Sequence, residues 1–574
     1  MTLRSRARGE APAQTPAGAP SPAGVLIQAR AGVAATAVSI VTTIVVAALG
    51  PSVMEPPLPG RRGQPPWSLV AHPSGYLVVA LTAAAIIAGA LGLALLMRAA
   101  RRGWTVSPRL VVGLGLLAAA VLAFLPPFGS SDHLSYAAYG RMLVTGHNPY
   151  LTSPSMVARL GDPVAKAVED WKTSPSVYGV LATGAQAVAS LIGGTSVRLT
   201  VFVLSLLNLA GFAGTGLLLH RLAGGDRARQ FRAALLWTCN PLLLQVLVAG
   251  EHVDSQAIVF GVGAVAAFGL ALRRSAAGAG ARRCLLPAAA AGAFAGLAFA
   301  IKLSLILVPV GLAAACLFAR PARSNPAQAN SAQAGQRPAE GAAGRGTGWF
   351  RAPAVSLLAG LTVGFAVVAV VAVAIGGLTS VRSALSAGSY VAIGTPWRWV
   401  RAAISLASGE TAADDIVKAA AVVAVLALAW LMLHRLPGPA RLTPLERIGG
   451  PGADPWDAGS RAASLAARGA LAFALAWLTA GPYVLPWYDA LAWALLPLLP
   501  WSAIDWFVLA RTTSLAVGYL PARTVAMPAG TGWLITIVRR GVTPSLLLIV
   551  AVLLVITLRS QQVTNRAVPA TGSA

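Results

Sequence analysis

The stretch FLPPFGSSDHLSYAAYGRMLVTGHNPYLTSP, residues 124–154, is a polar loop that interrupts a series of long apolar runs. Its acidic residue Asp132 closely follows the apolar run that ends near Leu125. A carboxylate at the edge of a membrane-length segment is costly unless it is paired or functional. Basic loops between apolar runs explain most other polar groups of the chain, but they do not explain Asp132. We therefore expect the functional site in this loop.

The composition is that of a protein with many membrane-spanning helices. Of 574 residues, 56% are hydrophobic and 11% are charged, and the mean hydropathy is +0.70. Apolar runs close to the ~20 residues that cross a bilayer recur along the chain. These values exclude a soluble globular protein. They predict an all-α polytopic membrane protein with about 14 transmembrane helices.

The net charge of +26 reflects membrane topology rather than nucleic-acid binding. It arises from 44 Lys and Arg residues against 18 Asp and Glu residues. The arginines form short clusters between apolar runs, as expected of cytoplasmic loops under the positive-inside rule. Cys239, Cys284 and Cys316 lie in or beside apolar runs without ligand spacing, so neither a disulfide framework nor a metal site is expected.

One apolar run, residues 177–193, decides the topology of everything after it. As a full span it would place the arginines of residues 221–232 outside, against the charge rule, so we interpret it as an interfacial helix. Loop 126–198 is then external. The expected spans are residues 32–50, 76–97, 110–125, 199–219, 233–249, 256–272, 285–301, 303–319, 354–375, 417–434, 470–480, 490–500, 502–520 and 544–558.

The chain is expected to consist of two transmembrane modules, residues 31–319 and 353–560. We expect cytoplasmic tails at residues 1–30 and 561–574, and we expect the first of these tails to be basic and disordered. Residues 320–352 are rich in Ala, Gly, Pro, Gln and Arg and form a disordered cytoplasmic linker in this interpretation.

Acidic residues concentrate on the side that this topology places outside. The positive-inside rule says little about acids, so carboxylates beside apolar spans require another reason. Asp132, Glu251 and Asp254 are the candidates for function. The acids assigned to the outer side are Glu55, Asp132, Asp162, Glu169, Asp170, Glu251, Asp254, Glu410, Asp414, Asp415 and Asp489.

Glycosyl transfer from a lipid phosphate sugar requires groups of this kind. A positioned carboxylate removes the proton of the attacking hydroxyl, and Asp132 is the candidate base. Cations stabilise the departing phosphate, and Lys302, between two apolar runs, is the first candidate. Further cations are Arg141, Arg398 and Arg401, and aromatic residues that could stack on sugars or form an interfacial belt are Trp397, Trp399, Tyr483, Trp487, Tyr488 and Trp493.

Each of these residues also has a structural interpretation. Asp132 could cap a helix that begins near Leu134. Glu251 and Asp254 could cap or solvate a tight turn between two spans, and Lys302 could extend to the outer surface.

Five stretches together resemble one enzyme family. They are SSDHLSYAAYGRMLVTGHNPY, WKTSPSVYGVLATGAQAVASLIGGTSVRLT, WTCNPLLLQVLVAGEHVDSQAI, AFAIKLSLIL and YVLPWYDALAW. The combination is similar to the actinobacterial polyprenyl-phosphomannose-dependent α-1,6-mannosyltransferases of the MptA/MptB type, most of all to MptB, within the GT-C glycosyltransferases. The resemblance extends over roughly residues 32–558.

The resemblance implies a GT-C helical bundle whose first large outer loop carries the catalytic acid, here Asp132, and short juxtamembrane helices. It implies an inverting enzyme with a polyprenyl-phosphate mannose donor and a lipid-anchored mannan acceptor, the lipomannan and lipoarabinomannan core. The active site would lie on the extracytoplasmic side of the plasma membrane, without metal or other cofactor. The expected substrate-binding residues are Arg141, Glu251, His252, Asp254, Lys302, Arg398, Tyr483, Trp487 and Tyr488.

Other functions remain compatible with the sequence. A transporter or lipid flippase would also have many spans and outer acids, but such folds usually show internal repeats, and none is convincing here. A membrane scaffold would not need Asp132. Within the enzyme class, another polyprenyl-phosphate sugar such as arabinose or glucose is the alternative, because sugar identity depends on a few hydroxyl contacts.

Overall fold

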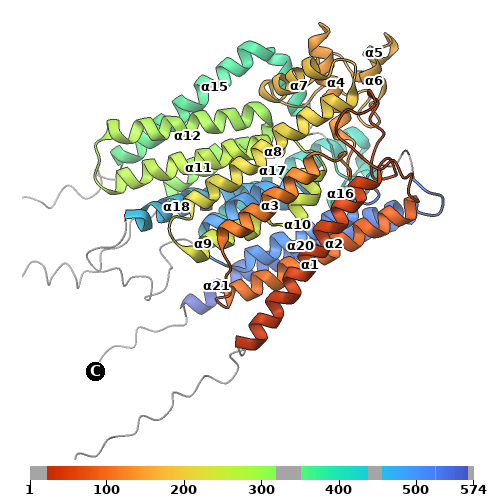
Figure 1. Cartoon of the computed structure of the whole chain (residues 1–574). Coiled ribbons are helices and arrows are strands. Elements are labelled where there is room, and N and C mark those ends of the chain that lie inside the picture. Colours follow the sequence, from red (N-terminus) through yellow and green to blue (C-terminus); the bar gives the residue numbers. More distant parts are fainter. Residues whose placement is uncertain are drawn as a thin grey trace, which may run out of the picture.

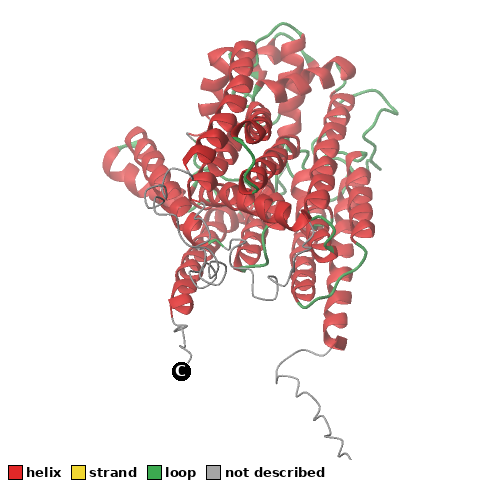
Figure 2. Ribbon diagram, turned by 90° about the vertical axis from the view of Figure 1, so that its left-hand side faces the viewer, coloured by secondary structure: helices red, strands yellow, loops and turns green. Residues whose placement is uncertain are grey.

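The protein is a bundle of helices. A computed structural model describes residues 22–318, residues 351–436 apart from 387 and 389, and residues 455–566 apart from 524 and 526. Within these residues every regular element is a helix (Figure 2), which confirms the expected all-α class. Most of the tail expected at residues 1–30 and of the linker expected at 320–352 lies outside the described residues, but the first helix already begins at Pro22.

Ten helices of the described part are long and apolar enough to cross a membrane, and each overlaps an expected span. One of them, residues 227–249, is interrupted at Asn240, whose side chain caps the turn that follows. The ten are α1 (Pro22–Leu49), α2 (Gly75–Arg101), α8 (Val197–Leu222), α9 to η2 (Arg227–Ala249), α11 (Asp254–Ala276), α12 (Ala281–Ile301), α15 (Arg351–Ser386), α17 (Glu410–Arg435), α18 (Pro455–Ala480) and η9 (Leu534–Val542) with α21 (Thr543–Arg566).

The other four expected spans are shorter elements. α3 (Pro108–Ala123) and α20 (Ala503–Gly518) have 16 residues each, about 24 Å, against a hydrocarbon core of about 30 Å. η3 (Leu303–Ile306) with α13 (Leu307–Phe318) follows the break at Lys302. α19 (Ala490–Leu495) gives way to the short η8 (Leu496–Leu498), which contains Pro497. The sequence count of about 14 spans therefore includes four partial ones.

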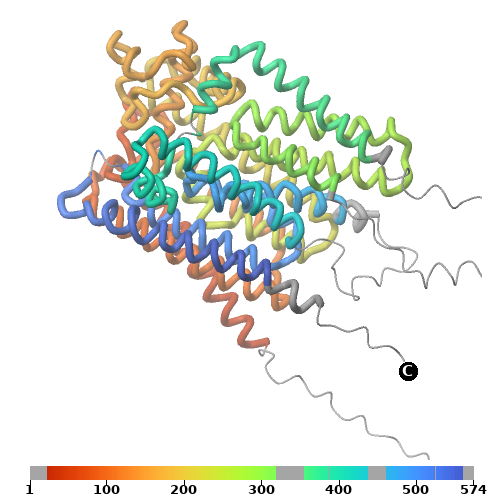
Figure 3. The backbone as a smooth tube through the Cα atoms, turned by 180° about the vertical axis from the view of Figure 1, so that it is seen from behind, coloured from red at the N-terminus to blue at the C-terminus, as the bar shows by residue number. Residues whose placement is uncertain are grey.

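Short helices gather at one end of the bundle (Figure 1). Four come from the first large loop: α4 (Asp132–Val144), α5 (Pro154–Arg159), α6 (Pro163–Lys166) and α7 (Val180–Gly193). The segment with α16 (Trp397–Ser408) and the loop before η9 lie at the same end, as seen from behind in Figure 3. The start of α1 and the end of α21 lie at the opposite end. α7 has only 14 residues, in keeping with the interfacial helix expected at 177–193.

Close backbone contacts fix α4, which carries Asp132. A Cβ atom at Gly140 of α4 would lie 2.1 Å from the carbonyl oxygen of Gln186 on α7. A Cβ at Gly193, at the end of α7, would lie 2.0 Å from Oγ1 of Thr200 on α8. Small residues let helices approach this closely where apolar packing alone is weak. α4 is thus held against α7, and α7 against the long helix α8.

Candidate active site

The Asp132 carboxylate faces into the protein and does not cap its own helix. Asp132 is the first residue of α4, whose N-cap is Ser131, and no side-chain cap hydrogen bond is present there. Its backbone N–H donates to Ser130 Oγ at 3.1 Å. The residue is only 9% exposed. The structure thus leaves the carboxylate available to a ligand, rather than to the helix end.

Asp132 is surrounded by groups that change its acidity. Burial raises the pKa of Asp132 to about 7, and the charges of Asp170 and Asp254 act in the same direction. Lys302 opposes this shift. Ser131 Oγ donates a short hydrogen bond to Asp170 Oδ2, which holds that second acid beside the site. A carboxylate with a pKa close to the operating pH suits general base catalysis.

His252 is a further polar neighbour of Asp132. Its Nδ1 lies 3.6 Å from Asp132 Oδ2. Its ring stacks on Trp487 with the centroids 3.5 Å apart. Burial and the nearby Lys302 hold the pKa of His252 well below its usual range, so the imidazole is neutral. The contact is therefore not an ion pair at neutral pH.

Lys302 and Asp254 form a pair across the start of α11 and the end of α12. Lys302 Nζ donates to both carboxylate oxygens of Asp254 at 2.7 Å. The same ammonium group lies 3.8 Å from the ring centroid of Tyr488. A buried lysine requires such partners, because an unpaired charge in this environment is very costly. Lys302 is thus a fixed cation at the boundary of the site.

Asp132 and Lys302 line two adjoining cavities. We call the first the Asp132 chamber; it is lined by Asp132, Trp171, Tyr178, Tyr390, Tyr483 and Tyr488, among others. The second, the α17 groove, has a volume of about 420 Å³ and is lined by Tyr178, Lys302, Leu307, Val422, Leu426 and Tyr488, among others. Val177, Tyr178, Tyr483 and Tyr488 belong to both linings, so the two cavities share a wall.

The α17 groove is apolar and opens at the side of the bundle. Val422 and Leu426 of α17 line it and are each 58% exposed. Exposed aliphatic side chains on a membrane-length helix are expected to face lipid. Lys302 and Lys418 are the charged residues of this lining. The groove thus combines an apolar channel with cations, whereas the Asp132 chamber holds the carboxylate.

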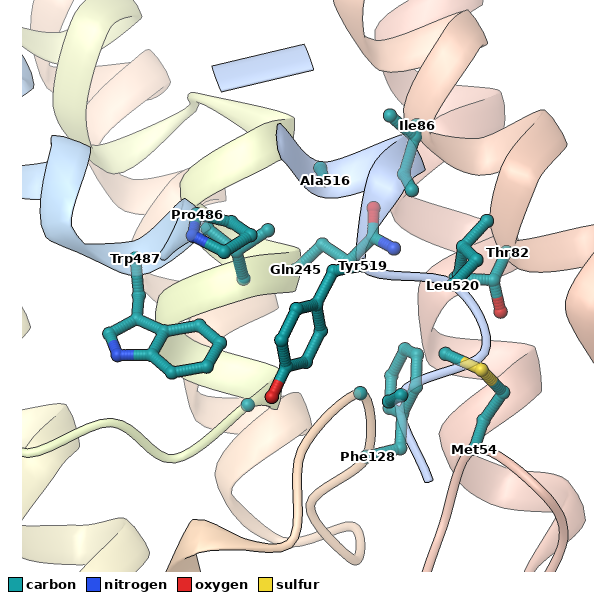
Figure 4. Close-up of a pocket in the computed structure, with 14 residues that line it drawn as sticks. Met54, Thr82, Ile86, Phe128, Gln245, Pro486, Trp487, Ala516, Tyr519 and Leu520 are labelled. Carbon is teal, nitrogen blue, oxygen red and sulfur yellow. The ribbon is translucent and has the colours of Figure 1, made fainter. Parts of the chain in front are cut away.

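A third cavity, behind Trp487, is too small for a sugar. Its volume is about 30 Å³, roughly the share of one water molecule in the liquid. Figure 4 shows Trp487 on one side, Met54 and Leu520 on the other, and Tyr519 between them. Oε1 of Gln245, which also lines this cavity, has no hydrogen-bond partner in the described part of the chain. An ordered water suits this position better than a substrate.

The structure brings most of the residues expected from the sequence together, and leaves three apart. Asp132, Lys302, Tyr483 and Tyr488 line the chamber or the groove. His252, Asp254 and Trp487 lie in contact with this set, because His252 is next to Asp132, Asp254 bonds Lys302 and Trp487 stacks on His252. Arg141 bonds Asp162 at 2.8 Å, and Asp162 caps α6. Glu251 accepts from Ser205 Oγ at 2.9 Å, and Arg398 lies on α16. These three line neither cavity.

Four aromatic residues of the chamber were not expected from the sequence: Tyr139, Trp171, Tyr178 and Tyr390. Trp171 directly follows Asp170 and has a positive φ of 59°, which is unusual for a bulky residue. Tyr178 follows in the same loop, and its hydroxyl donates to that of Tyr136 at 3.3 Å. The run DWKTSPSVY, polar residues between aromatic ones in the loop of Asp132, was the available signal. No sequence signal pointed to Tyr390, because its loop is distant in sequence from the rest of the site.

Metal ligands do not cluster in this region. No group of three or more His, Cys, Asp or Glu side chains suitable for a metal ion is found in residues 22–318, 351–436 and 455–566, as far as they are described. The arrangement around Asp132 offers a carboxylate, a paired lysine and aromatic surfaces. These groups can bind and orient a sugar phosphate and move a proton.

Residues 29–318 match a family model described as alpha-(1->6)-mannopyranosyltransferase, N-terminal domain. The chain is 28% identical over 134 residues to alpha-(1->6)-mannopyranosyltransferase A of Corynebacterium glutamicum, a match that covers 23% of this chain and 27% of that protein. It is 31% identical over 146 residues to a probable alpha-(1->6)-mannopyranosyltransferase of Mycolicibacterium smegmatis, covering 25% of each.

A further relative is alpha-(1->6)-mannopyranosyltransferase B of Corynebacterium glutamicum, 29% identical over 130 residues and covering 22% of each chain. The matched part of this chain therefore spans about a quarter of the length of these curated relatives. No solved structure matches the chain.

Proposed function

Because the chain belongs to the alpha-(1->6)-mannopyranosyltransferase family, we propose that it transfers mannose in α-1,6 linkage. The donor in this proposal is polyprenyl-phosphate mannose, and the acceptor is a lipid-anchored mannan, the core of lipomannan and lipoarabinomannan. The reaction takes place at the outer face of the plasma membrane. The relatives' names supply the linkage and the sugar.

The shared wall of the Asp132 chamber and the α17 groove is the observation that carries this proposal. A polyprenyl chain fits an apolar groove that opens toward lipid, and a phosphate fits the cation at its edge, Lys302. The sugar then extends past Tyr178 and Tyr488 toward Asp132. The chamber itself measures about 60 Å³, so a sugar held there also reaches into the cavities beside it.

The proposed step is a single in-line displacement. Asp132 takes the proton of the acceptor 6-hydroxyl while its oxygen forms a bond to the anomeric carbon. The bond from that carbon to the phosphate oxygen breaks, and polyprenyl phosphate leaves with the electron pair. Lys302 stabilises the charge that develops on the phosphate, and Asp254 keeps Lys302 in position. The configuration at the anomeric carbon inverts.

Replacement of Asp132 tests the proposal. An amide at this position cannot accept the proton, so Asp132→Asn is expected to reduce transfer by about 10²- to 10⁴-fold. The measurement uses purified protein in detergent with radiolabelled polyprenyl-phosphate mannose and α-1,6-mannobiose. Asp162→Asn is the matched control, because Asp162 lies in the same loop but caps α6 and pairs with Arg141. Full activity of Asp132→Asn would remove this residue from the mechanism.

The same assay separates the alternatives. The α17 groove and Lys302 contact the lipid and the phosphate, which are the same in every donor of this class. The sugar is therefore identified by comparing transfer from polyprenyl-phosphate mannose with transfer from polyprenyl-phosphate glucose and arabinose. Turnover in detergent is expected without any closed bilayer. Activity that appeared only in sealed vesicles would favour a transporter instead.

A further inference from the structure

A pocket lined by aromatic residues adjoins the Asp132 chamber. Its volume is about 260 Å³. It shares Trp171, Tyr390, Tyr483 and Leu485 with the chamber, but only Tyr483 with the α17 groove. The chamber is therefore adjacent both to the groove and to this aromatic pocket. We define the aromatic pocket by Trp171, Tyr390, Gly394, Tyr483, Tyr519 and Arg539.

We propose that the aromatic pocket is the acceptor site, which binds the terminal mannose units of an α-mannan next to Asp132. This inference rests on the proposed function, since it names where the second substrate of that reaction binds. The lipid donor occupies the α17 groove, and the acceptor occupies the aromatic pocket.

The geometry of displacement requires the two substrates to arrive from opposite sides. An in-line attack brings the hydroxyl oxygen to the face of the anomeric carbon opposite the leaving phosphate. If the phosphate lies at Lys302 in the α17 groove, the acceptor must enter the chamber from another direction. The aromatic pocket is adjacent to the chamber, and Lys302 does not line it.

The lining of the pocket suits a carbohydrate. The rings of Trp171 and Tyr390 lie 5.5 Å apart, and those of Tyr390 and Tyr483 lie 5.8 Å apart. The negative faces of aromatic rings attract the weakly positive C–H groups of a sugar ring, and the hydroxyl groups of Tyr add hydrogen-bonding capacity. A volume of about 260 Å³ equals roughly nine water molecules at their share of the liquid volume, the scale of a sugar ring rather than of a polyprenyl chain.

A fixed cation, Arg539, lines the pocket. Arg539 of η9 donates from Nε to the carbonyl oxygen of Gly518 at 2.9 Å. One of its terminal nitrogens donates to the carbonyl oxygen of Pro521 at 3.1 Å, and its guanidinium lies 4.8 Å from the ring centroid of Tyr519. These contacts join η9 to the end of α20. The pocket wall is thereby held in one arrangement, as a sugar site with few orienting polar groups requires.

Another cavity, of about 230 Å³, is a weaker candidate for the acceptor. It is lined by Trp397, Phe507, Arg511 and Leu548, among others, and shares no lining residue with the Asp132 chamber. A hydroxyl group of a ligand held there would not reach Asp132. The aromatic pocket shares four lining residues with that chamber and is the better candidate.

Two glycines allow each site to be narrowed separately. A Cβ atom at Gly394 would make only ordinary contacts, 3.6 Å from Thr543 Cγ2 and 3.7 Å from the carbonyl oxygen of Arg539. A Cβ at Gly388, which lines the α17 groove, would meet no atom of the described residues within 4 Å. Gly394→Val therefore narrows the aromatic pocket, and Gly388→Val narrows the groove.

The test compares KM values for the two substrates. Gly394→Val is expected to raise KM for α-1,6-mannobiose by about three- to tenfold, with KM for the polyprenyl-phosphate mannose within about twofold of wild type. Gly388→Val is expected to raise KM for polyprenyl-phosphate mannose and to leave KM for α-1,6-mannobiose within about twofold of wild type. Equal thermal unfolding temperatures in detergent exclude misfolding. If wild type is active and Gly394→Val leaves the acceptor KM unchanged, or raises the donor KM instead, the assignment is overturned.

A binding measurement keeps this inference separate from the proposed function. Saturation-transfer NMR with α-1,6-mannobiose and no donor is expected to show binding to wild type and to Gly388→Val, and weaker binding to Gly394→Val. If wild type transfers no mannose, the proposed function fails whatever this measurement shows. If wild type transfers mannose but Gly394→Val binds mannobiose as well as wild type does, the acceptor site lies elsewhere.

Discussion

Asp132 is a carboxyl group whose ionisation falls in the neutral range. Burial raises its pKa to about 7. The ionised form is the base, so kcat/KM is expected to be low below this pH, to rise as the pH passes through about 7, and to level off above it. The pH profile of mannosyl transfer in detergent measures this. A rate that stays constant from about pH 5 to pH 8 would exclude Asp132 as a base with this pKa.

Asp170 provides a control for this profile. Its negative charge contributes to the raised pKa of Asp132. In Asp170→Asn that charge is absent, so the ascending limb of the profile is expected to move to lower pH. An unchanged profile in an active Asp170→Asn protein would assign the limb to another group.

The pair of Lys302 and Asp254 combines a structural with a catalytic role, and the two can be separated. Lys302→Met leaves the buried Asp254 without its cation, which is expected to destabilise the protein by about 3–5 kcal/mol. Lys302→Met with Asp254→Asn is expected to recover much of this stability but not the transfer activity, because no cation then faces the phosphate. Thermal unfolding and transfer rates of the single and double variants measure both effects. Recovery of activity in the double variant would show that Lys302 acts only by neutralising Asp254.

The sequence predicts some of these residues better than others. Asp132 could be singled out because it follows an apolar run and has no topological explanation. The bond between Lys302 and Asp254 joins residues 48 positions apart. Their spacing carries no information about contact, since two helices and a turn separate them. Arg141 had the right charge in the right loop, but the nearby Asp162 binds it instead.

The contact between α4 and α7 determines where Asp132 is held. A Cβ at Gly140 would lie 2.1 Å from the carbonyl oxygen of Gln186, so Gly140→Ala must displace α4 or α7. Overpacking of this kind is expected to cost about 1–3 kcal/mol and to lower kcat. Thermal unfolding in detergent and transfer rates measure the two effects.

A second glycine provides the control for this contact. Gly184 lies on α7, where a Cβ would meet no described atom within 4 Å. Gly184→Ala is expected to leave activity unchanged, and its higher helix propensity favours stability by up to about 1 kcal/mol. If Gly140→Ala matched wild type in both stability and kcat, the close approach of α4 and α7 would not be needed for the site.

Helices were predicted well where length and hydropathy agree, and poorly where they do not. The run at 199–219 became α8, Val197–Leu222, which agrees within three residues at both ends. The run at 417–434 became α17, Glu410–Arg435, which agrees at its end but begins seven residues earlier. The runs at 490–500 and 502–520 formed shorter elements. α19 ends at Leu495, before Pro497, and α20 begins after its N-cap Ser502 and ends at Gly518. Periodicity alone does not show such breaks, because tertiary contacts decide how far a helix continues.

The two ends of the bundle are expected to lie on different sides of the membrane. The helices around Asp132 lie at one end, and the start of α1 lies at the other (Figure 1). Leu160, in the loop of Asp132, and Ala277, after α11, are both exposed. In intact cells, an impermeant maleimide is expected to label Leu160→Cys but not Ala277→Cys, in a background without the three native cysteines. The opposite labelling pattern would place Asp132 in the cytoplasm.

The convergence of distant segments is the property that no local pattern predicts. Trp171, Tyr390, Tyr483 and Tyr519 come from four separate parts of the chain and meet beside one carboxylate. Each of these residues, taken alone, is typical of a membrane-interface belt. Only the packed bundle shows that they line adjacent cavities, with the Asp132 chamber next to both the α17 groove and the aromatic pocket.

A structure of the protein with a non-hydrolysable polyprenyl phosphonate mannose tests this arrangement most directly. We expect the phosphonate at Lys302, the prenyl chain in the α17 groove and the anomeric carbon in the chamber beside Asp132. A sugar bound away from Asp132, or a prenyl chain outside the α17 groove, would contradict it.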